Sequence, residues 1–237
     1  MDKPKLNYGK TFLIGFGFFG ISVMWTLYNA YVPIFLQAGN PDFKAVGEVG
    51  FGFKPGLTGF IMTLDNIAAL LIQPPIGAWS DKLRTPIGRR MPFILIGAPI
   101  GALAFGLIPL QSVLPLFVAC TSTLLLSMAL WRTPVVALMP DITPSHYRSQ
   151  ANGIINFMGG IGAIIAFLYG ADLYDMNPAY PFWLGSVLVI LSALLVFAFI
   201  REPKEYETSD TTPPNLWISL KKVIQEQEKS PLRILLA

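Results

Sequence analysis

The sequence from Gln73 to Ile94 reads QPPIGAWSDKLRTPIGRRMPFI and forms a short charged turn between two apolar runs. The run before it, residues 56–79, carries one charged residue, Asp65, and the run after it, residues 91–131, carries none. A helix that crosses the hydrocarbon core of a bilayer needs about 20 mainly apolar residues. The pattern therefore predicts two membrane-spanning helices that are joined by a basic turn.

The composition of the whole chain supports a membrane protein. Of its 237 residues, 53% are hydrophobic and 13% are charged, whereas a soluble domain has about 25% charged residues. A soluble domain of this size cannot bury so much apolar surface. The one cysteine, Cys120, excludes a disulfide scaffold, and the aromatic content excludes a disordered chain. The net charge of +3 gives no reason to expect a nucleic-acid partner, so a multi-pass protein in a lipid bilayer remains.

Charged residues and a proline-flanked break divide the chain into six expected spans. The first two cover residues 11–36 and 56–79, and the last two cover residues 150–170 and 180–200. The third runs from residue 91 to the break at Pro109–Pro115, and the fourth runs from that break to residue 139. Each has the length that a spanning helix needs. The six-helix bundle thus occupies residues 1–200. After it we expect a polar linker over residues 201–231 and, over residues 232–237, the start of a truncated seventh helix of a longer protein.

Lysine and arginine predict the orientation of these spans. With the N-terminus in the cytoplasm, all 17 Lys and Arg except Arg132, Lys44 and Lys54 fall in inner segments. Cytoplasmic segments are enriched in these residues. We therefore expect both termini and the linker in the cytoplasm, and the protein in the cell membrane (the inner or plasma membrane). A cleaved signal peptide is the disfavoured alternative, because the first apolar run is too long and no small-residue cleavage site closes it.

The turn after the second expected span resembles a family signature. Gly77, Asp81 and the sequence Gly88-Arg89-Arg90 match the pattern Gly-x-x-x-Asp-Arg-x-Gly-Arg-Arg, which joins helices 2 and 3 in major facilitator superfamily transporters. The extra residues before Gly88 and the flanking Gln-Pro and Pro-Phe-Ile resemble the sucrose-type sugar:proton symporters. They are more distantly similar to the glycoside–pentoside–hexuronide:cation symporters.

A second match lies one repeat later, where residues 140–153 read PDITPSHYRSQANG. This superfamily repeats its acidic and basic turn between helices 4 and 5. The resemblance covers the whole chain, which corresponds to six of the usual twelve helices. It implies an all-α membrane protein with six transmembrane helices in two inverted three-helix repeats, the N-terminal half of a major facilitator fold.

The resemblance also implies a function. It indicates secondary active transport, by proton-coupled symport of a sugar or disaccharide, with alternating access against a second six-helix half. It implies no cofactor and no bound metal. A membrane enzyme is disfavoured, since the sequence has no Ser–His–Asp arrangement, zinc-ligand spacing or phosphate-binding loop. The alternative that stays open is a non-transporting truncated or accessory membrane module that needs a partner half.

The charged turns carry the expected gate. Charge pairs at a membrane surface form and break at low cost, which suits a gate with two arrangements of similar energy. In the family, the acid at position 81 is held to contact the other half and to favour one closed face. The candidate gating residues are Gly77, Asp81, Gly88, Arg89, Arg90, Asp141 and Arg148. The basic turn also fits a role in topology alone.

Two ionisable residues lie within the expected spans, and such residues are functional by default because burying a charge in a bilayer is costly. Asp65 is the candidate proton carrier, and Arg132 is a candidate for contact with the sugar. The alternatives are a structural hydrogen bond for Asp65 and, for Arg132, snorkelling toward the cytoplasm or a structural pair with an interior acid. In the sodium-coupled relatives two helix-2 carboxylates bind the cation. Those positions are Ala69 and Gln73 here, so the resemblance favours coupling to the proton, or to no ion, over coupling to sodium.

Polar and aromatic side chains on the expected helices suit a sugar, which is bound by hydrogen bonds and aromatic faces. Helix 1 offers Trp25, Tyr28 and Asn29, and helix 5 offers Asn152 and Asn156 at helical spacing. The candidate substrate-binding residues are Trp25, Tyr28, Asn29, Gln73, Arg132, Asn152 and Asn156. Hydrogen bonding between helices is the alternative role for these residues.

Overall fold

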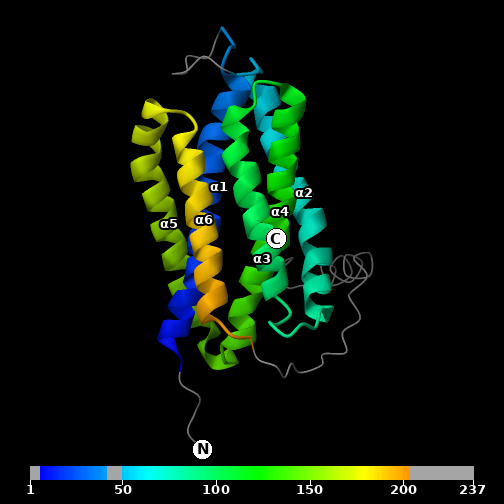
Figure 1. The fold of residues 1–237 in the computed structure, drawn as a ribbon, viewed down its shortest axis with the longest axis vertical. Helices are drawn as coiled ribbons and strands as arrows, with labels where there is room; N and C mark the ends of the chain where they lie inside the picture. The colour runs from blue at the N-terminus through cyan, green and yellow to red at the C-terminus, as the bar shows by residue number, and fades with distance from the viewer. Residues whose placement is uncertain (1–5, 42–49, 203–237) are drawn as a thin grey trace, which may run out of the picture. The chain divides into compact units, whose positions relative to one another are not determined.

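The computed structural model describes residues 6–41 and 50–202, apart from the side chains of Asp65 and Ala68. The described helices, drawn in Figure 1, are α1 (Tyr8–Gln37), α2 (Pro55–Lys82), α3 (Met91–Leu107), α4 (Leu114–Ile142), α5 (Arg148–Met176) and α6 (Tyr180–Phe199). Two short 3-10 turns, Ile108–Leu110 and Ser145–Tyr147, follow α3 and α4. The predicted start of a seventh helix, and the linker after residue 202, lie outside the described residues.

The prediction of an all-α membrane protein with six spans is confirmed. Six helices in the described ranges are long and apolar enough to cross a membrane, the third of them counted as Met91–Leu110 with its 3-10 turn. The predicted break is also present, since Pro109 lies in that turn and α4 begins at Leu114.

Several helices extend beyond their expected ends. α4 runs through Pro140 to Ile142, and α5 continues from Gly170 to Met176. The expected ends were placed by counting apolar residues, and a charged residue ends the apolar run without ending the helix. Prolines inside α1, α2, α3 and α4 do not interrupt these helices, as is common in membrane spans.

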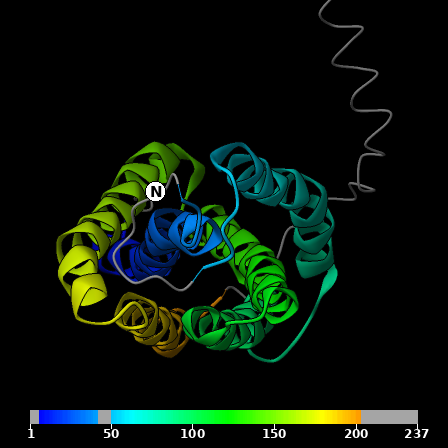
Figure 2. The same ribbon diagram turned by 90° about the horizontal axis from the view of Figure 1, so that it is seen from above.

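α1 lies in the middle of the bundle and packs mainly against α5 and α6 (Figure 2). Val23, Met24 and Leu27 on α1 are fully buried. α3 packs against α4 and α6, whereas α2 packs mainly against α4 and is the least buried of the six. The bundle therefore holds α2 mainly through α4, while α1 is enclosed by several helices.

Small residues let α1 and α5 approach closely. A Cβ built on Gly162 would lie 2.6 Å from the carbonyl oxygen of Phe19 on α1. A contact this close needs a residue without a side chain, as in other membrane helix pairs. Gly160, two residues earlier on α5, has no neighbouring atom within 4 Å of such a Cβ.

Replacing Gly162 by alanine tests this approach. Because the new Cβ would meet backbone, the helices must move apart, and we expect the free energy of unfolding to fall by about 1–3 kcal/mol, as in other overpacked sites. The measurement is the melting temperature of the purified protein in detergent. Gly160→Ala is the matched control and should melt at or above the parent temperature. Equal melting of the two variants would contradict the close contact.

Candidate functional site

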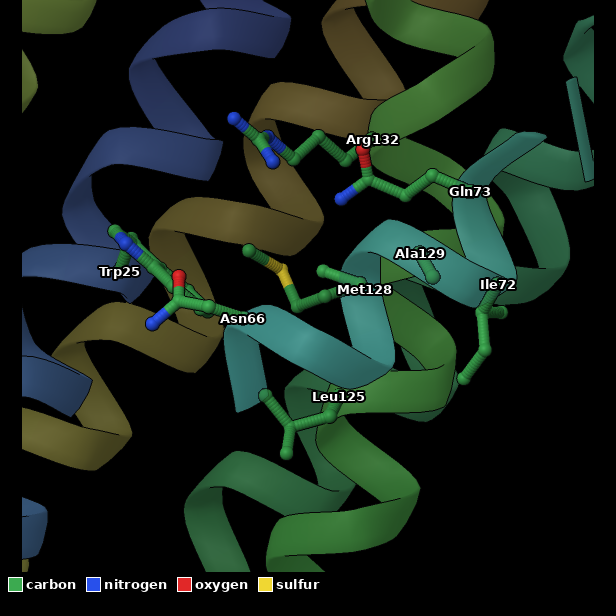
Figure 3. A pocket seen from close by; sticks show the side chains of 9 residues that line it. Trp25, Asn66, Ile72, Gln73, Leu125, Met128, Ala129 and Arg132 are labelled. Atoms are coloured by element: carbon green, nitrogen blue, oxygen red, sulfur yellow. The ribbon is translucent and has the colours of Figure 1, made fainter. Parts of the chain in front are cut away.

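A pocket opens between α1, α2 and α4 in the described part of the chain. Its cavity volume is about 50 Å³, within about 460 Å³ of empty space that includes open solvent. Its lining residues are Trp25 of α1, Asn66, Ala69, Ile72 and Gln73 of α2, and Leu125, Met128, Ala129 and Arg132 of α4 (Figure 3). The lining is mainly apolar with a few polar groups, which is typical of a small-molecule site.

Helical periodicity explains which residues of α2 and α4 enter the pocket. Residues 66, 69 and 73 share one face of α2, and residues 125, 128, 129 and 132 share one face of α4, since positions three, four and seven apart lie above one another. Ala69 and Ala129 are small, so they leave room between the two helices. The pocket is therefore a gap between two facing helix stripes.

The polar groups occupy defined positions in this pocket. In Figure 3 the side chains of Arg132 and Gln73 lie at one end, Leu125 lies at the other, and Trp25 and Asn66 lie between them. A guanidinium donates several hydrogen bonds, and each amide both donates and accepts them. An indole adds a flat apolar face. Together these groups suit a ligand that carries hydroxyls on a ring with one apolar face.

The predicted substrate residues divide into two groups. Trp25, Gln73 and Arg132 line the pocket, and Tyr28 is buried behind it with its ring stacked on Trp25 at 5.6 Å between centroids. Tyr28 therefore fixes the orientation of the indole. Asn29 is exposed and is not among the lining residues.

Asn152 and Asn156 of α5 also lie outside the pocket lining. Both are exposed, and the Nδ2 atom of Asn156 donates to the carbonyl oxygen of Asn152 at 2.8 Å and to its Oδ1 at 3.1 Å. These two residues thus bond to each other along α5, and the substrate-binding role expected for them stays a prediction. The side chain of Asp65, the expected proton carrier, lies outside the described part of the chain.

The sequence reasoning missed Asn66 and the apolar residues of the lining. A signal was present, because Asn66 precedes Gln73 by seven residues and so lies two turns away on the same face. Leu125 and Met128 carried no such signal, since they resemble every other apolar residue of α4.

The second feature is an ionic cluster at one end of the bundle, at the bottom of Figure 1, where α2 ends and α3 begins. We call it the charged junction and define it by its residues: Asp81, Arg89, Arg90, Asp141 and Glu202. Arg89 donates to the Oδ1 atom of Asp141 at 2.6 Å, and the Nε of Arg90 donates to the Oδ2 of Asp141 at 3.0 Å. The sequence predicted gating roles for four of these residues, and the structure places them in contact.

The two aspartates of the charged junction differ in exposure. Asp141 binds both arginines and its side chain is 12% exposed, whereas that of Asp81 is 52% exposed. Arg90, which also contacts Asp81 and the hydroxyl of Ser80, is buried. Charge pairs that water does not screen are stronger, so Asp141 is the main partner of the arginines.

Glu202 is the member of the charged junction that the sequence did not reveal. Its carboxylate accepts hydrogen bonds from the backbone N–H groups of Arg89, Arg90 and Met91 at 2.8–2.9 Å. These are free donors at the start of α3, where negative charge is favoured by the helix dipole. Gly88 leaves the space for it: its φ is +115°, and a Cβ there would lie 2.5 Å from the Cδ of Glu202.

The remaining predicted gating residues, Gly77 and Arg148, lie where neighbouring helices approach each other. A Cβ on Gly77 would lie 3.4 Å from Thr133, so this glycine lies where α2 approaches α4. The Nη2 of Arg148 donates to the carbonyl oxygen of Pro140 at 3.1 Å and so joins the start of α5 to the end of α4.

The six apolar helices are those of an integral multi-pass membrane protein. The family pattern of the Major Facilitator Superfamily matches residues 11–237, so the chain belongs to this superfamily. The resemblance that the basic turn indicated is thereby confirmed.

Curated relatives are sugar carriers by name. The chain is 36% identical over 101 residues to "Proton-associated sugar transporter A" of Homo sapiens, a match that covers 42% of this chain and 12% of that protein. It is 25% identical over 222 residues to "Sucrose transport protein SUT3" of Oryza sativa subsp. indica, a match that covers 83% of this chain and 41% of that protein. It is 26% identical over 175 residues to "Sucrose transport protein SUC3" of Arabidopsis thaliana, a match that covers 65% of this chain and 27% of that protein. The chain thus spans less than half the length of these relatives.

Replacing each aspartate of the charged junction by asparagine tests whether Asp141 contributes more to stability than Asp81. Asn keeps the shape and removes the charge, so Asp141→Asn leaves two arginine charges without their main partner. We expect a loss of about 3 kcal/mol in the free energy of unfolding, as for a broken buried pair, against at most about 1 kcal/mol for the exposed Asp81. Melting curves of the two variants in one detergent check this. A larger loss for Asp81→Asn would refute the ranking.

Replacing Glu202 by glutamine tests the contact with α3. The Glu202→Gln variant keeps one acceptor oxygen and loses the charge, so we expect a loss of about 1–2 kcal/mol in the free energy of unfolding and faster amide hydrogen exchange at residues 89–91. Arg201→Gln, at the exposed neighbouring position, is the control and should change neither quantity. Unchanged exchange at residues 89–91 in Glu202→Gln would show that the carboxylate does not hold this helix end.

Proposed function

We propose that the chain is the N-terminal half of a secondary active transporter that moves a sugar or disaccharide together with a proton by alternating access. The observation that carries this is the pocket between α1, α2 and α4, which presents Arg132, Gln73, Asn66 and Trp25 to one space. The superfamily and the names of the relatives support a sugar as the ligand.

The chemistry of the pocket fits a sugar better than an apolar ligand. Asn66 and Gln73 supply donors and acceptors for hydroxyls, and Trp25 supplies a ring face. An apolar ligand would leave these groups, and Arg132, without hydrogen bonds, which is costly in a site that excludes water. A ligand with several hydroxyls replaces the water that these groups lose.

The charged junction supports alternating access. Its ion pairs join the ends of α2, α3 and α4, and backbone N–H groups at the start of α3 hold Glu202, which follows α6. We assign to an exchange of partners among these groups the change between two arrangements that alternating access requires. We place this end in the cytoplasm of a cell with the protein in its inner or plasma membrane, on the Lys and Arg distribution. A second six-helix half would complete the transport path.

Proton coupling is assigned to Asp65. It precedes the lining residue Asn66 on α2, and the pocket lining as described contains no carboxylate. An acid within a span is a standard element of proton relays. The assignment makes Asp65 necessary for coupling and unnecessary for binding.

Uptake into proteoliposomes tests the proposal. The full-length protein and the chain of residues 1–237 are each supplied with labelled sucrose and maltose under an imposed pH gradient. We expect uptake by the full-length protein only. Arg132→Ala should weaken the apparent affinity by about 10–100-fold, the effect of losing hydrogen bonds to a charged group. Asp65→Asn should abolish accumulation against a gradient and retain exchange of labelled for unlabelled sugar.

Asp172→Asn is the matched control, because Asp172 is an exposed acid near the end of α5 and outside the pocket lining. It should accumulate sugar like the parent. Accumulation by Asp65→Asn would remove Asp65 from the coupling role. Absence of uptake and exchange in every form would favour the alternative of a non-transporting membrane module.

A further inference from the structure

Helix α2 is buried in the described bundle only near its two ends. Thr58, near its start, is 3% exposed, and Ser80, in its last turn, is fully buried. Between these two residues, every residue of α2 whose side chain the structure describes is exposed or half-buried. The middle of the helix therefore has little packing to fix its direction.

The end of α2 away from the charged junction is fixed by the segment that precedes it. The backbone N–H of Phe51 donates to the carbonyl oxygen of Phe35 at 3.0 Å, and that of Phe53 donates to a second carbonyl of the last turn of α1, that of Leu36, at 2.8 Å. Such oxygens lack partners within their own helix. The ring of Phe51 meets that of Phe117 on α4 edge-on, at 5.0 Å between centroids. The start of α2 is thus tied to α1 and α4.

The other end of α2 is fixed by the start of α3. The hydroxyl of Ser80 accepts a hydrogen bond from the guanidinium of Arg90, which also contacts Asp81. The ring of Trp79 meets that of Phe93 edge-on, at 5.0 Å between centroids. These contacts tie the last turns of α2 to α3, whereas the contacts at its start tie it to α1 and α4.

Pro74 and Pro75 interrupt the hydrogen bonds of α2 between the two fixed ends. A proline has no N–H, so the helical bonds to the carbonyl oxygens of Leu70 and Leu71 do not form, and each proline disfavours the helical conformation of the residue before it. The prolines of the other described helices stand singly. Seen from above, α2 changes direction along its length (Figure 2). Kinks in helices usually lie at prolines.

This interruption lies at one end of the pocket. Gln73 directly precedes Pro74, and it lies with Arg132 at the end of the pocket opposite Leu125 (Figure 3). The α2 residues of the lining all come before the two prolines, whereas Asp81 of the charged junction comes after them. The pocket wall and the charged junction therefore lie on different sides of the interruption.

We propose that Pro74 and Pro75 form a hinge, about which the last two turns of α2 move with the start of α3 while the pocket wall stays in place. From Pro75 to Lys82 the helix rises about 11 Å, so a change of about 20° in its bend moves Lys82 by about 4 Å. This movement opens or closes the Gln73 end of the pocket. That it serves a ligand rests on the proposed function, whereas the hinge itself does not.

Distances between spin labels test the hinge without any ligand. Electron double resonance is measured on the purified full-length protein in lipid nanodiscs, with Cys120 replaced by alanine. Labels on Lys82→Cys and Gln150→Cys, both exposed, report on the end of α2 at the charged junction. Labels on Gly56→Cys and Asp172→Cys, also exposed, report on its other end. We expect the distances of the first pair to spread more widely than those of the second, by about 4 Å.

Replacing both prolines by alanine supplies the two missing N–H groups. In Pro74→Ala/Pro75→Ala the spread of the Lys82–Gln150 distances should fall to that of the other pair. Both prolines are exposed, so the change removes little packing, and the variant should melt at or above the parent temperature. Pro99→Ala makes the same change in α3, which packs against α4 and α6, and is the matched control. It should leave both distance distributions unchanged.

The results separate the hinge from the proposed function. A Lys82–Gln150 distribution as narrow as that of the other pair in the parent protein, or one that stays broad in Pro74→Ala/Pro75→Ala, would overturn the hinge. Equal narrowing in Pro99→Ala would also overturn it, because the effect would then not belong to α2. None of these results bears on sugar uptake, and a failure of uptake would leave the measured hinge in place.

Discussion

The pairing of Arg89 and Arg90 with Asp141 is the interaction that organises the charged end of the bundle. It fixes the start of α3 against the end of α4. Asp81 then brings in the end of α2, and Glu202 brings in the residues that follow α6. Four helix ends are thus joined by charge and by backbone donors, next to core residues such as Met91 and Ile200.

The pocket and the charged junction share the helix α2. Its α2 wall is the least packed part of the bundle, since α2 lies mainly against α4. Gln73 lies two turns before Asp81 on this helix, and Gly77 lies between them at the approach to α4. The same helix therefore carries one wall of the pocket and one part of the charged junction.

The fold followed closely from the sequence because the physical rule behind it is local. Each span shows itself by its run of apolar residues, and hydrogen bonds within the segment force that run into a helix in a bilayer. The break between α3 and α4 followed from Pro109 and Pro115 in the same way. The ends of α4 and α5 were placed too early, since apolar composition marks the hydrocarbon core and not the last turn of a helix.

The sequence by itself determined the six spans, the superfamily and part of the residues of both sites. Tertiary structure alone decided which of those residues meet. Periodicity shows which side chains share a face of a helix, but the rotation of each helix is set by its packing against the others, as at Gly162. That rotation places Trp25 in the pocket and leaves Asn156 out of it. It also brings Glu202 to the backbone of Arg90, a contact across more than a hundred residues that no local pattern encodes.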